Sequence, residues 1–487
     1  MNDVIRHNCL MNPFLTTTVL SICLAVFSTA PGATEEGAME GALPPPIPRP
    51  DFIRNKPFIP DLMLKDKKEG KYVTGIPAVG WDAEEGFNLG GFAEWYNNGS
   101  KTDPFFRTAP YRTKMFLGGT VSTEDTVKLF ARLDWLYVQD TPFRLRFDGF
   151  YEKNPIKNYF GQGDAGIPLI SPRTGKHFDE FKSYQGNLNE IFVGPVGACS
   201  AGQECTYSRY NKYDTKDFIF NATMEYDLMG GLLRPLLGLQ IRHVDIKDYT
   251  GKRVGLIGEN GRATQASTRL KEDCDKGITN GCDGGWDNQV RIGLTYDSRN
   301  FEPNPTSGIL AQANFAAAFK FLGSKYAYQR LTLSGAFYHD FFKDVFDTQQ
   351  LILAGRATYN MNFGNAPFYA LSRLGFNDFD KFGVGGFWTL RGYKAQRFIG
   401  DSSFVMNGEL RWFFTEWSFW GQHLKPGVTI FGDLGRSYKN IQLDFDDIQG
   451  AGGVGFRLAW NLATMISFDF GISKEDKIFY MELGTMF

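Results

Sequence analysis

An alternation of apolar and polar residues with a period of two constrains this chain most, and it recurs from Lys71 to the C-terminus. In residues 290–297 the even positions are all apolar, while the odd positions are polar or glycine. The same pattern returns over 351–363 and 403–414. A period of two places alternate side chains on opposite faces of a β-strand. The sequence therefore predicts an all-β chain.

The alternating segments predict an antiparallel sheet of about sixteen strands, an even number. The longest connections, 151–213, 248–285 and 364–402, all follow odd-numbered strands, so they all emerge at the same end of the sheet. This parity predicts extracellular long loops and a periplasmic N-terminus. The predicted strands are 71–80, 86–97, 112–122, 127–138, 143–150, 214–228, 231–247, 286–298, 308–320, 325–341, 348–363, 403–415, 426–434, 450–460, 464–473 and 478–487.

Alternation would also suit a soluble sandwich, so the residue types must distinguish the two folds. Charged residues recur on the less apolar face of the long strands, as a water-filled interior permits. Aromatic residues, which include 45 Phe and 21 Tyr, gather near strand ends as membrane-interface girdles do. Beyond residues 1–33, no apolar run reaches 18 residues and the mean hydropathy of the chain is −0.28, which excludes a helical membrane protein. We expect a transmembrane antiparallel β-barrel.

The N-terminal residues 1–33 have the layout of a signal peptide. Arg6 and His7 precede an apolar stretch over 11–30, whose core is too short to span a bilayer. Residues 34–70 are rich in proline and predict an extended linker in the periplasm. The barrel then covers 71–487. A net charge of −2 gives no indication of nucleic-acid binding.

Four cysteines of the expected mature chain form two close pairs, Cys199 with Cys205 and Cys274 with Cys282. In an oxidising compartment they predict two disulfides within extracellular loops. The alternative is a metal site, but neither spacing is that of a zinc-binding Cys-x2-Cys motif. We expect no metal and no cofactor.

The final segment alternates back from the terminal aromatic residue. Its apolar face comprises Phe479, Met481, Leu483 and Phe487, interrupted by Thr485. A C-terminal aromatic closing such a strand is what outer-membrane assembly machinery reads. We therefore expect this face to be an assembly signal.

An enzyme is the least favoured reading. The five histidines occur in no nucleophile arrangement, and neither Gly-x-Ser-x-Gly nor His-Glu-x-x-His is present. We predict no catalytic residues.

The region from Lys71 to Phe487 resembles the bacterial surface antigen family, the barrel shared by BamA, TamA and two-partner secretion transporters. The family carries a Gly-Gly pair and an Arg-Gly-aromatic tripeptide in a long extracellular loop folded into the barrel lumen. A Phe-x-Asp-x-Gly motif follows on the next strand but one. The matching residues here are Gly385, Gly386, Arg391, Gly392, Tyr393, Phe431, Asp433 and Gly435.

The resemblance implies that Arg391 and Asp433 lock this loop inside the lumen. A planar guanidinium can bind a carboxylate through two hydrogen bonds, and Gly392 permits a sharp turn. The alternative is that Arg391 is a solvated loop charge and that Asp433 pairs with an adjacent strand.

The resemblance implies a role in membrane-protein assembly or in translocation of protein or lipid. BamA and its relatives also carry periplasmic POTRA modules, and the short segment before Lys71 leaves no room for one. The expected partners are outer-membrane lipid including lipopolysaccharide, the barrel assembly machinery and an unidentified periplasmic protein. A passive porin with a loop-restricted lumen is the alternative function. The expected location is the outer membrane of a Gram-negative bacterium.

Overall fold

A computed structural model gives the fold, and the described residues all belong to one compact unit, residues 43–487. The expected signal peptide, 1–33, lies outside the described residues. Within them, no helix is both long enough and apolar enough to cross a membrane. The described residues are 47–64, 67–82, 85–255, 263–343, 345–346, 348–377, 381–419, 422–460 and 464–487.

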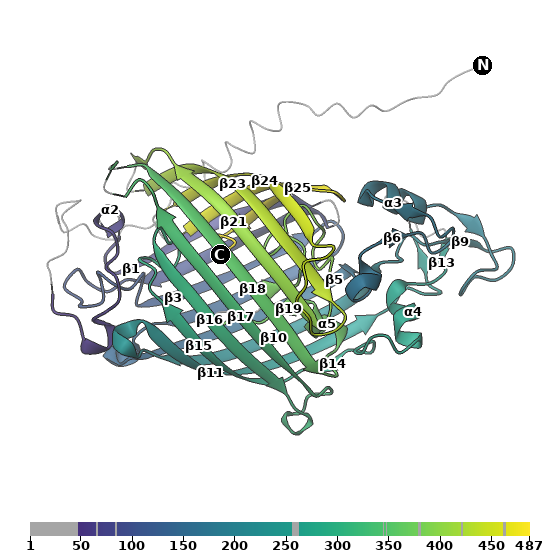
Figure 1. Ribbon diagram of the computed structural model, residues 1–487, viewed down its shortest axis with the longest axis horizontal. Coiled ribbons are helices and arrows are strands. Elements are labelled where there is room, and N and C mark those ends of the chain that lie inside the picture. The colour runs from purple at the N-terminus through teal and green to yellow at the C-terminus, as the bar shows by residue number, and fades with distance from the viewer. Residues whose placement is uncertain are drawn as a thin grey trace, which may run out of the picture. The chain divides into compact units, whose positions relative to one another are not determined.

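Sixteen long strands follow one another in chain order, each antiparallel to the next, and form a barrel-shaped sheet (Figure 1). The short strands β14 (Gly285–Trp286) and β22 (Trp417–Phe419) extend the same sheet. The long strands are β1 (Lys71–Asp82), β2 (Gly86–Asn97), β3 (Thr113–Ser122), β4 (Val127–Trp135), β5 (Phe143–Asn158), β10 (Lys212–Tyr226), β11 (Leu233–Lys247), β15 (Gln289–Asp297), β16 (Gly308–Ala318), β17 (Tyr328–Asp340), β18 (Gln350–Gly364), β21 (Ser402–Phe413), β23 (Gln422–Tyr438), β24 (Gln449–Trp460), β25 (Thr464–Ser473) and β26 (Lys477–Leu483).

The strands have one apolar face and one polar face, as the sequence predicts. In β10, Phe218 and Phe220 are exposed on the outside, whereas Asp217 and Asn221 are buried on the inside. Such an outer face suits lipid tails and the inner face suits a polar lumen, which makes the sheet a transmembrane β-barrel. The predicted all-β class and strand number are confirmed.

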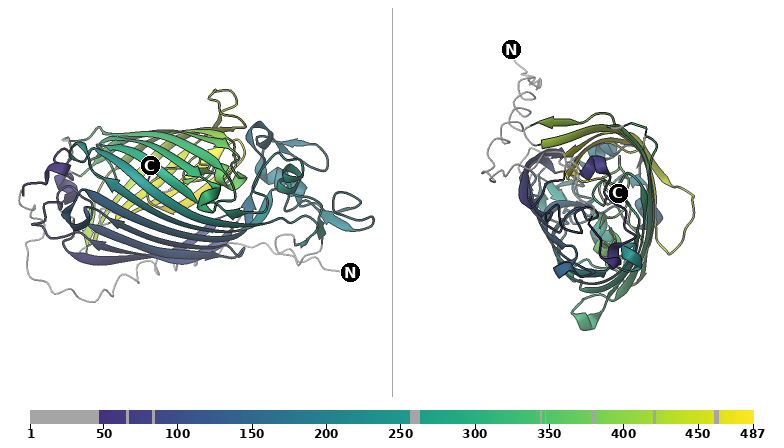
Figure 2. Two further views of the ribbon diagram at one scale, coloured as in Figure 1. Left: turned by 90° about the horizontal axis from the view of Figure 1, so that it is seen from below. Right: turned by 90° about the vertical axis from the view of Figure 1, so that its left-hand side faces the viewer.

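The barrel has two distinct ends. We call the end where β1 begins and β26 ends the terminal mouth, and the opposite end the loop mouth (Figure 2). All consecutive long strands from β1 to β26 are joined by backbone ladders. Within the described residues, however, no ladder joins the first strand, β1, to the last strand, β26. These two strands therefore form a seam without a regular ladder.

A small cap built from two long connections, 159–211 and 248–288, stands at the loop mouth (Figure 2). Its core packs around Tyr184, Tyr207 and Tyr210. The two predicted disulfides, Cys199–Cys205 and Cys274–Cys282, are present in these connections. The elements of the cap are β6 (Leu169–Ile170), β7 (His177–Phe178), α3 (Phe181–Leu188), β8 (Phe192–Val193), β9 (Glu204–Thr206), β12 (Arg253–Val254), β13 (Ala263–Gln265) and α4 (Arg269–Asp275).

The connection between β18 and β21, which we call the lumen loop (365–401), folds into the barrel. It carries α5 (Phe368–Leu371), β19 (Arg373–Leu374) and β20 (Lys381–Phe382), and Figure 1 shows α5 and β19 within the outline of the sheet. Its apolar side chains form a buried cluster against β21. The loop therefore occupies lumen space.

Residues 47–70, which we call the mouth segment, differ from the expected linker. The segment contains a 3-10 turn, η2 (Asp51–Ile53), and the short helix α2 (Asp61–Leu64), and it packs on the terminal mouth (Figure 2). Proline content suggests an extended chain, but the segment also carries apolar residues that the barrel buries. Residues 34–46, the first part of the expected linker, lie outside the described residues.

Candidate functional site

Arg391 of the lumen loop is fully buried among carboxylates from three barrel strands. Its Nε and Nη2 donate to the two carboxylate oxygens of Asp433 at 2.8 and 2.9 Å. Its Nη1 donates to Glu409 at 2.6 Å and to Asp469 at 2.8 Å. The guanidinium carbon also lies 3.4 Å from the centre of the Phe431 ring. One loop arginine thus ties β21, β23 and β25 together.

Two further arginines complete this cluster, which we call the arginine centre. Arg411 donates to Glu409 at 2.7 Å, and Arg457 forms an ion pair with Asp469. All six charged side chains are at most 1% exposed. Three positive and three negative groups therefore balance one another, which a buried cluster requires because an unpaired buried charge is costly. The members are Arg391, Arg411, Arg457, Glu409, Asp433 and Asp469.

Glycines bring the loop backbone close to the barrel wall. Gly392 has φ +86°, and a Cβ there would lie 2.9 Å from the backbone carbon of Ile472 on β25. Gly385 has φ +117°, and Gly386 donates from its backbone to the Tyr393 carbonyl at 3.1 Å. All three glycines adopt a backbone conformation that other residues rarely accept.

The other motif residues shape the surroundings of the arginine centre. Tyr393 is fully buried, and its hydroxyl lies 3.4 Å from the Gly450 carbonyl. A Cβ at Gly435 would meet Val384 of the loop at 2.9 Å, so the glycine leaves room for it. All eight predicted motif residues are therefore brought into one region, and their role as a lock stays a proposal.

Two more arginines anchor the lumen loop. Arg397 is fully buried, donates to Glu475 at 2.8 Å and approaches the Phe160 ring at 4.5 Å. Arg373 donates to Asp217 on β10 at 3.1 Å, and Arg242 on β11 donates to the same carboxylate. The loop is thus tied both to the connection between β25 and β26, which contains Glu475, and to β10.

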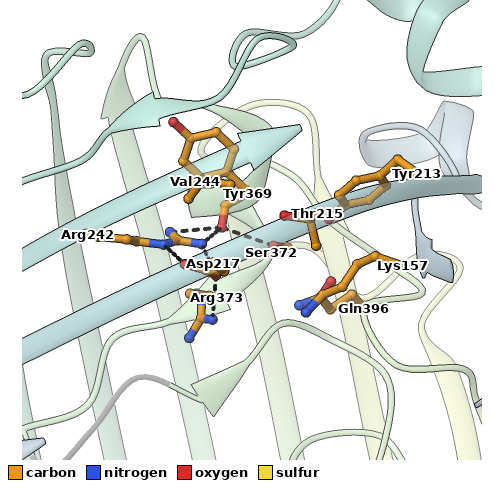
Figure 3. Close-up of a pocket in the computed structure, with 10 residues that line it drawn as sticks. All are labelled: Lys157, Tyr213, Thr215, Asp217, Arg242, Val244, Tyr369, Ser372, Arg373 and Gln396. Carbon is orange, nitrogen blue, oxygen red and sulfur yellow. Dashed lines mark hydrogen bonds and ion pairs between the residues drawn. The ribbon is translucent and has the colours of Figure 1, made fainter. Parts of the chain in front are cut away.

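Figure 3 shows the small pocket beside the second anchor, where Asp217 lies between the two arginines. Arg242 also donates to the Tyr369 carbonyl at 3.3 Å, so the positive charges already have acceptors. We therefore assign the pocket to the loop's anchorage rather than to a ligand. Its lining residues are Lys157, Tyr213, Thr215, Asp217, Arg242, Val244, Tyr369, Ser372, Arg373 and Gln396.

The C-terminal segment differs from the predicted strand 478–487. Phe479 and Met481 do lie on the outer face, 51% and 39% exposed. However, β26 ends at Leu483, and Gly484 with φ +110° follows it. Phe487 then lies inside the barrel.

Inward-facing side chains hold the end of the chain. The Phe487 ring lies 5.1 Å from the guanidinium of Arg356 and 5.2 Å from that of Arg411. Arg411 also donates to the Phe487 carbonyl at 3.2 Å, and Met486 is fully buried. Cation–π contacts and hydrogen bonds thus favour the inward turn over the expected outward face. A role of Phe479, Met481, Leu483 and Phe487 in assembly remains a proposal.

The mouth segment is held by a second buried cluster. Ile53 is fully buried beside Phe105 and Tyr137. Lys56 lies 3.5 Å from Glu302, in the connection between β15 and β16. Glu302 also accepts from Arg144 at 3.0 Å and from Arg234 at 2.8 Å.

The positive charges around Glu302 favour its ionised form. Burial alone would raise its pKa, but Arg144, Arg234 and Lys56 outweigh burial and hold the pKa well below its usual range. Nothing in the alternation pattern indicates this cluster, because its carboxylate comes from a connection rather than a strand.

The disulfides restrain the loop-mouth cap, and their removal should affect it locally. Each disulfide closes a short loop and stabilises the folded cap by about 2–3 kcal/mol, because it lowers the entropy of the unfolded chain. We expect a Cys274→Ser/Cys282→Ser variant to show faster proteolysis within 248–288 while the barrel's thermal transition stays unchanged. Limited proteolysis with mass spectrometry and circular dichroism melting would measure both. A lower thermal transition of the barrel in this variant would contradict the local role of the disulfides.

No cluster of three or more histidine, cysteine or carboxylate side chains suited to a metal ion is found in the described part of the chain.

Comparison with known proteins identifies relatives of this architecture. A family model described as the Omp85 superfamily domain matches residues 171–487, and a domain of unknown function, DUF5982, matches residues 50–112. The superfamily match confirms the resemblance to BamA-like barrels. A comparison with curated proteins finds no match.

Solved structures give distant matches. BamA from Haemophilus ducreyi lacking POTRA domains 1–3 is 13% identical with a TM-score of 0.43, over 85% of this chain and 69% of that one. CdiB from Escherichia coli is 11% identical with a TM-score of 0.45, over 85% of this chain and 62% of that one. CdiB from Acinetobacter baumannii is 8% identical with a TM-score of 0.40, over 86% of this chain and 60% of that one. The chain thus spans less than two thirds of either CdiB chain.

Proposed function

Because the chain belongs to the Omp85 superfamily, we propose that it acts in membrane-protein assembly or in the translocation of protein or lipid. Members of the superfamily are assembly and translocation proteins rather than enzymes. We extend this to the present chain as a non-enzymatic role. The mouth segment belongs to the region matched by a domain of unknown function, so the proposal includes it as part of the working barrel.

The arginine centre is the observation that supports this role over a passive porin. It holds the lumen loop against three strands through a fully buried arginine. A porin needs a wide, water-filled channel, whereas here a loop crosses the lumen and a segment packs on one mouth. A regulated path through the lumen, or along the seam between β1 and β26, suits this arrangement better.

We place the protein in the outer membrane of a Gram-negative bacterium, with the terminal mouth toward the periplasm. The barrel assembly machinery would then insert it, and lipids including lipopolysaccharide would surround it. An unidentified periplasmic partner would meet the mouth segment. The domain boundaries, with an exported leader over 1–33 and a barrel over 71–487, form part of the same proposal.

Deletion of the gene tests the role directly. An assembly or translocation factor should leave an outer membrane whose protein or lipid composition differs from that of the parent strain. Quantitative proteomics and lipid analysis of isolated outer membranes would detect the change. Complementation by the intact gene should reverse it, and an unchanged composition would argue against the proposal.

The alternative, a passive porin with a loop-restricted lumen, makes a different prediction. Purified protein in planar bilayers would then conduct steadily. We expect closed or rare, brief openings instead, because the lumen loop and the mouth segment both occupy the path. Steady conductance together with an unchanged membrane composition would favour the porin.

A further inference from the structure

Four phenylalanines form a continuous row on the inner wall of β2, β3, β4 and β5. The ring of Phe92 lies 5.5 Å from that of Phe116, which lies 6.4 Å from Phe130. Phe130 in turn lies 5.2 Å from Phe150. Gly118 makes room for the row, since a Cβ there would meet the Phe92 ring at 2.2 Å.

Strand parity shows that this row faces the lumen. Phe116 shares its strand face with Lys114, whereas Met115 and Leu117 on the other face are exposed to lipid. Phe130 shares its face with the buried Asp134 in the same way. The row therefore lies opposite the lipid-facing side of the same strands.

The rings are partly exposed within the lumen. All four side chains are of intermediate exposure, whereas the inward-facing residues of β10 are mostly buried. An exposed apolar surface in a polar interior is unfavourable, since burying each ring would be worth a substantial gain. The wall near β2–β5 therefore presents an apolar surface that a ligand can cover.

The position of the row favours a ligand from the membrane. It begins on β2, one strand away from the seam between β1 and β26, where no ladder is found within the described residues. Its rings lie near the middle of their strands, at the depth of the lipid tails outside. An acyl chain that passes the seam would meet Phe92 first.

Charged groups of both signs flank the row on the side of the terminal mouth. Lys114 pairs with Glu94 at 2.6 Å, and Arg132 pairs with Asp148. Each of these residues lies two positions from a phenylalanine of the row, on the same strand face. A headgroup with a phosphate and an ammonium finds partners for both charges there.

A polypeptide fits this surface less well. An extended peptide carries backbone N–H and C=O groups that need hydrogen-bond partners away from water. Along its length the row offers only ring faces and edges, which cannot satisfy a peptide backbone. An acyl chain has no such need.

We propose that this row, Phe92, Phe116, Phe130 and Phe150, binds an acyl chain of a zwitterionic phospholipid whose headgroup lies at the two ion pairs. Such a site would serve the lipid translocation included in the proposed function. Its biological role rests on that function, but the binding of the lipid does not. Binding itself is tested without any transport assay.

Photo-crosslinking from the row provides the test. p-Benzoylphenylalanine would replace Phe116, and irradiated outer membranes would be analysed by mass spectrometry of the purified protein. We expect an adduct with the mass of a phospholipid. The same residue at Leu117 is the positive control, because Leu117 is 46% exposed on the lipid face.

A matched pair of variants separates the lumen site from the outer surface. Phe92→Ser with Phe130→Ser should lower the adduct at position 116 by about tenfold or more, because two apolar contacts are lost. Leu89→Ser with Leu129→Ser, on the outer face of the same strands, should leave it unchanged.

Two outcomes would overturn the lipid site. One is an adduct at position 116 that contains only polypeptide. The other is the absence of any adduct at position 116 while the control at position 117 forms a lipid adduct. Lipid adducts in a protein whose deletion leaves the membrane composition unchanged would keep the site and reject the proposed function.

Discussion

Replacing Arg391 by alanine should destabilise the barrel strongly and free the lumen loop. The change leaves Glu409, Asp433 and Asp469 with only two of their three buried cations. Removing one partner of a buried ion pair costs about 3–5 kcal/mol, mainly because the remaining charge stays buried. We expect the barrel to unfold at a lower temperature, as measured by its heat-dependent shift in gel mobility. Proteolysis within 374–401 should also accelerate.

A double-mutant cycle makes this test specific. Asp433→Ala alone should also destabilise, but Arg391→Ala with Asp433→Ala restores the charge balance of the arginine centre. The double variant should therefore lose much less stability than the sum of the losses in the two single variants. Arg173→Ala is the control, because its pair with Glu190 is exposed and such pairs contribute about 0–1 kcal/mol. Additive losses, or an unchanged loop, would contradict the lock.

The strands could be predicted because a barrel in lipid leaves a strong local signal. Each wall residue faces either lipid or lumen, so the alternation repeats in every strand and marks its position. The predicted segments lie within a few residues of the observed strands for most of the barrel. Two large differences are at β5, which reaches Asn158 instead of residue 150, and at β26, which ends at Leu483 instead of Phe487.

The arginine centre could be predicted only in part. Family resemblance indicates Arg391 and Asp433, since both occur in recognisable motifs. Glu409 and Asp469 have no motif, and alternation says only that they face the lumen. Which lumen residues meet depends on how neighbouring strands are staggered and where the loop crosses, and neither is encoded locally.

The two chain ends show where local reasoning stops. Prolines in the mouth segment suggest an extended linker, yet Ile53 and Leu64 are almost fully buried. At the other end, alternation continues to Phe487, while Gly484 allows the backbone to turn inward. In both places, contacts with distant parts of the barrel decide the conformation.

Replacing Ile53 by aspartate should release the mouth segment while the barrel remains folded. Ile53 is fully buried on the terminal mouth, and an unpaired buried charge there costs several kcal/mol, so undocking is favoured. We expect trypsin to cut after Arg54 at least about tenfold faster than in the parent protein, because a loss of a few kcal/mol of docking free energy exposes this bond far more often. A cysteine at position 116 should also react faster with a bulky maleimide.

Phe58→Asp is the matched control, because Phe58 lies in the same segment but is 48% exposed. It should leave both the cleavage rate and the labelling rate near those of the parent protein. Glu302→Gln provides a second route to the same state, since it weakens the anchor of Lys56 without touching Ile53. If both Ile53→Asp and Glu302→Gln release the segment and speed labelling inside the lumen, the segment controls access through the terminal mouth. Release without faster labelling would show that the lumen loop alone blocks the path.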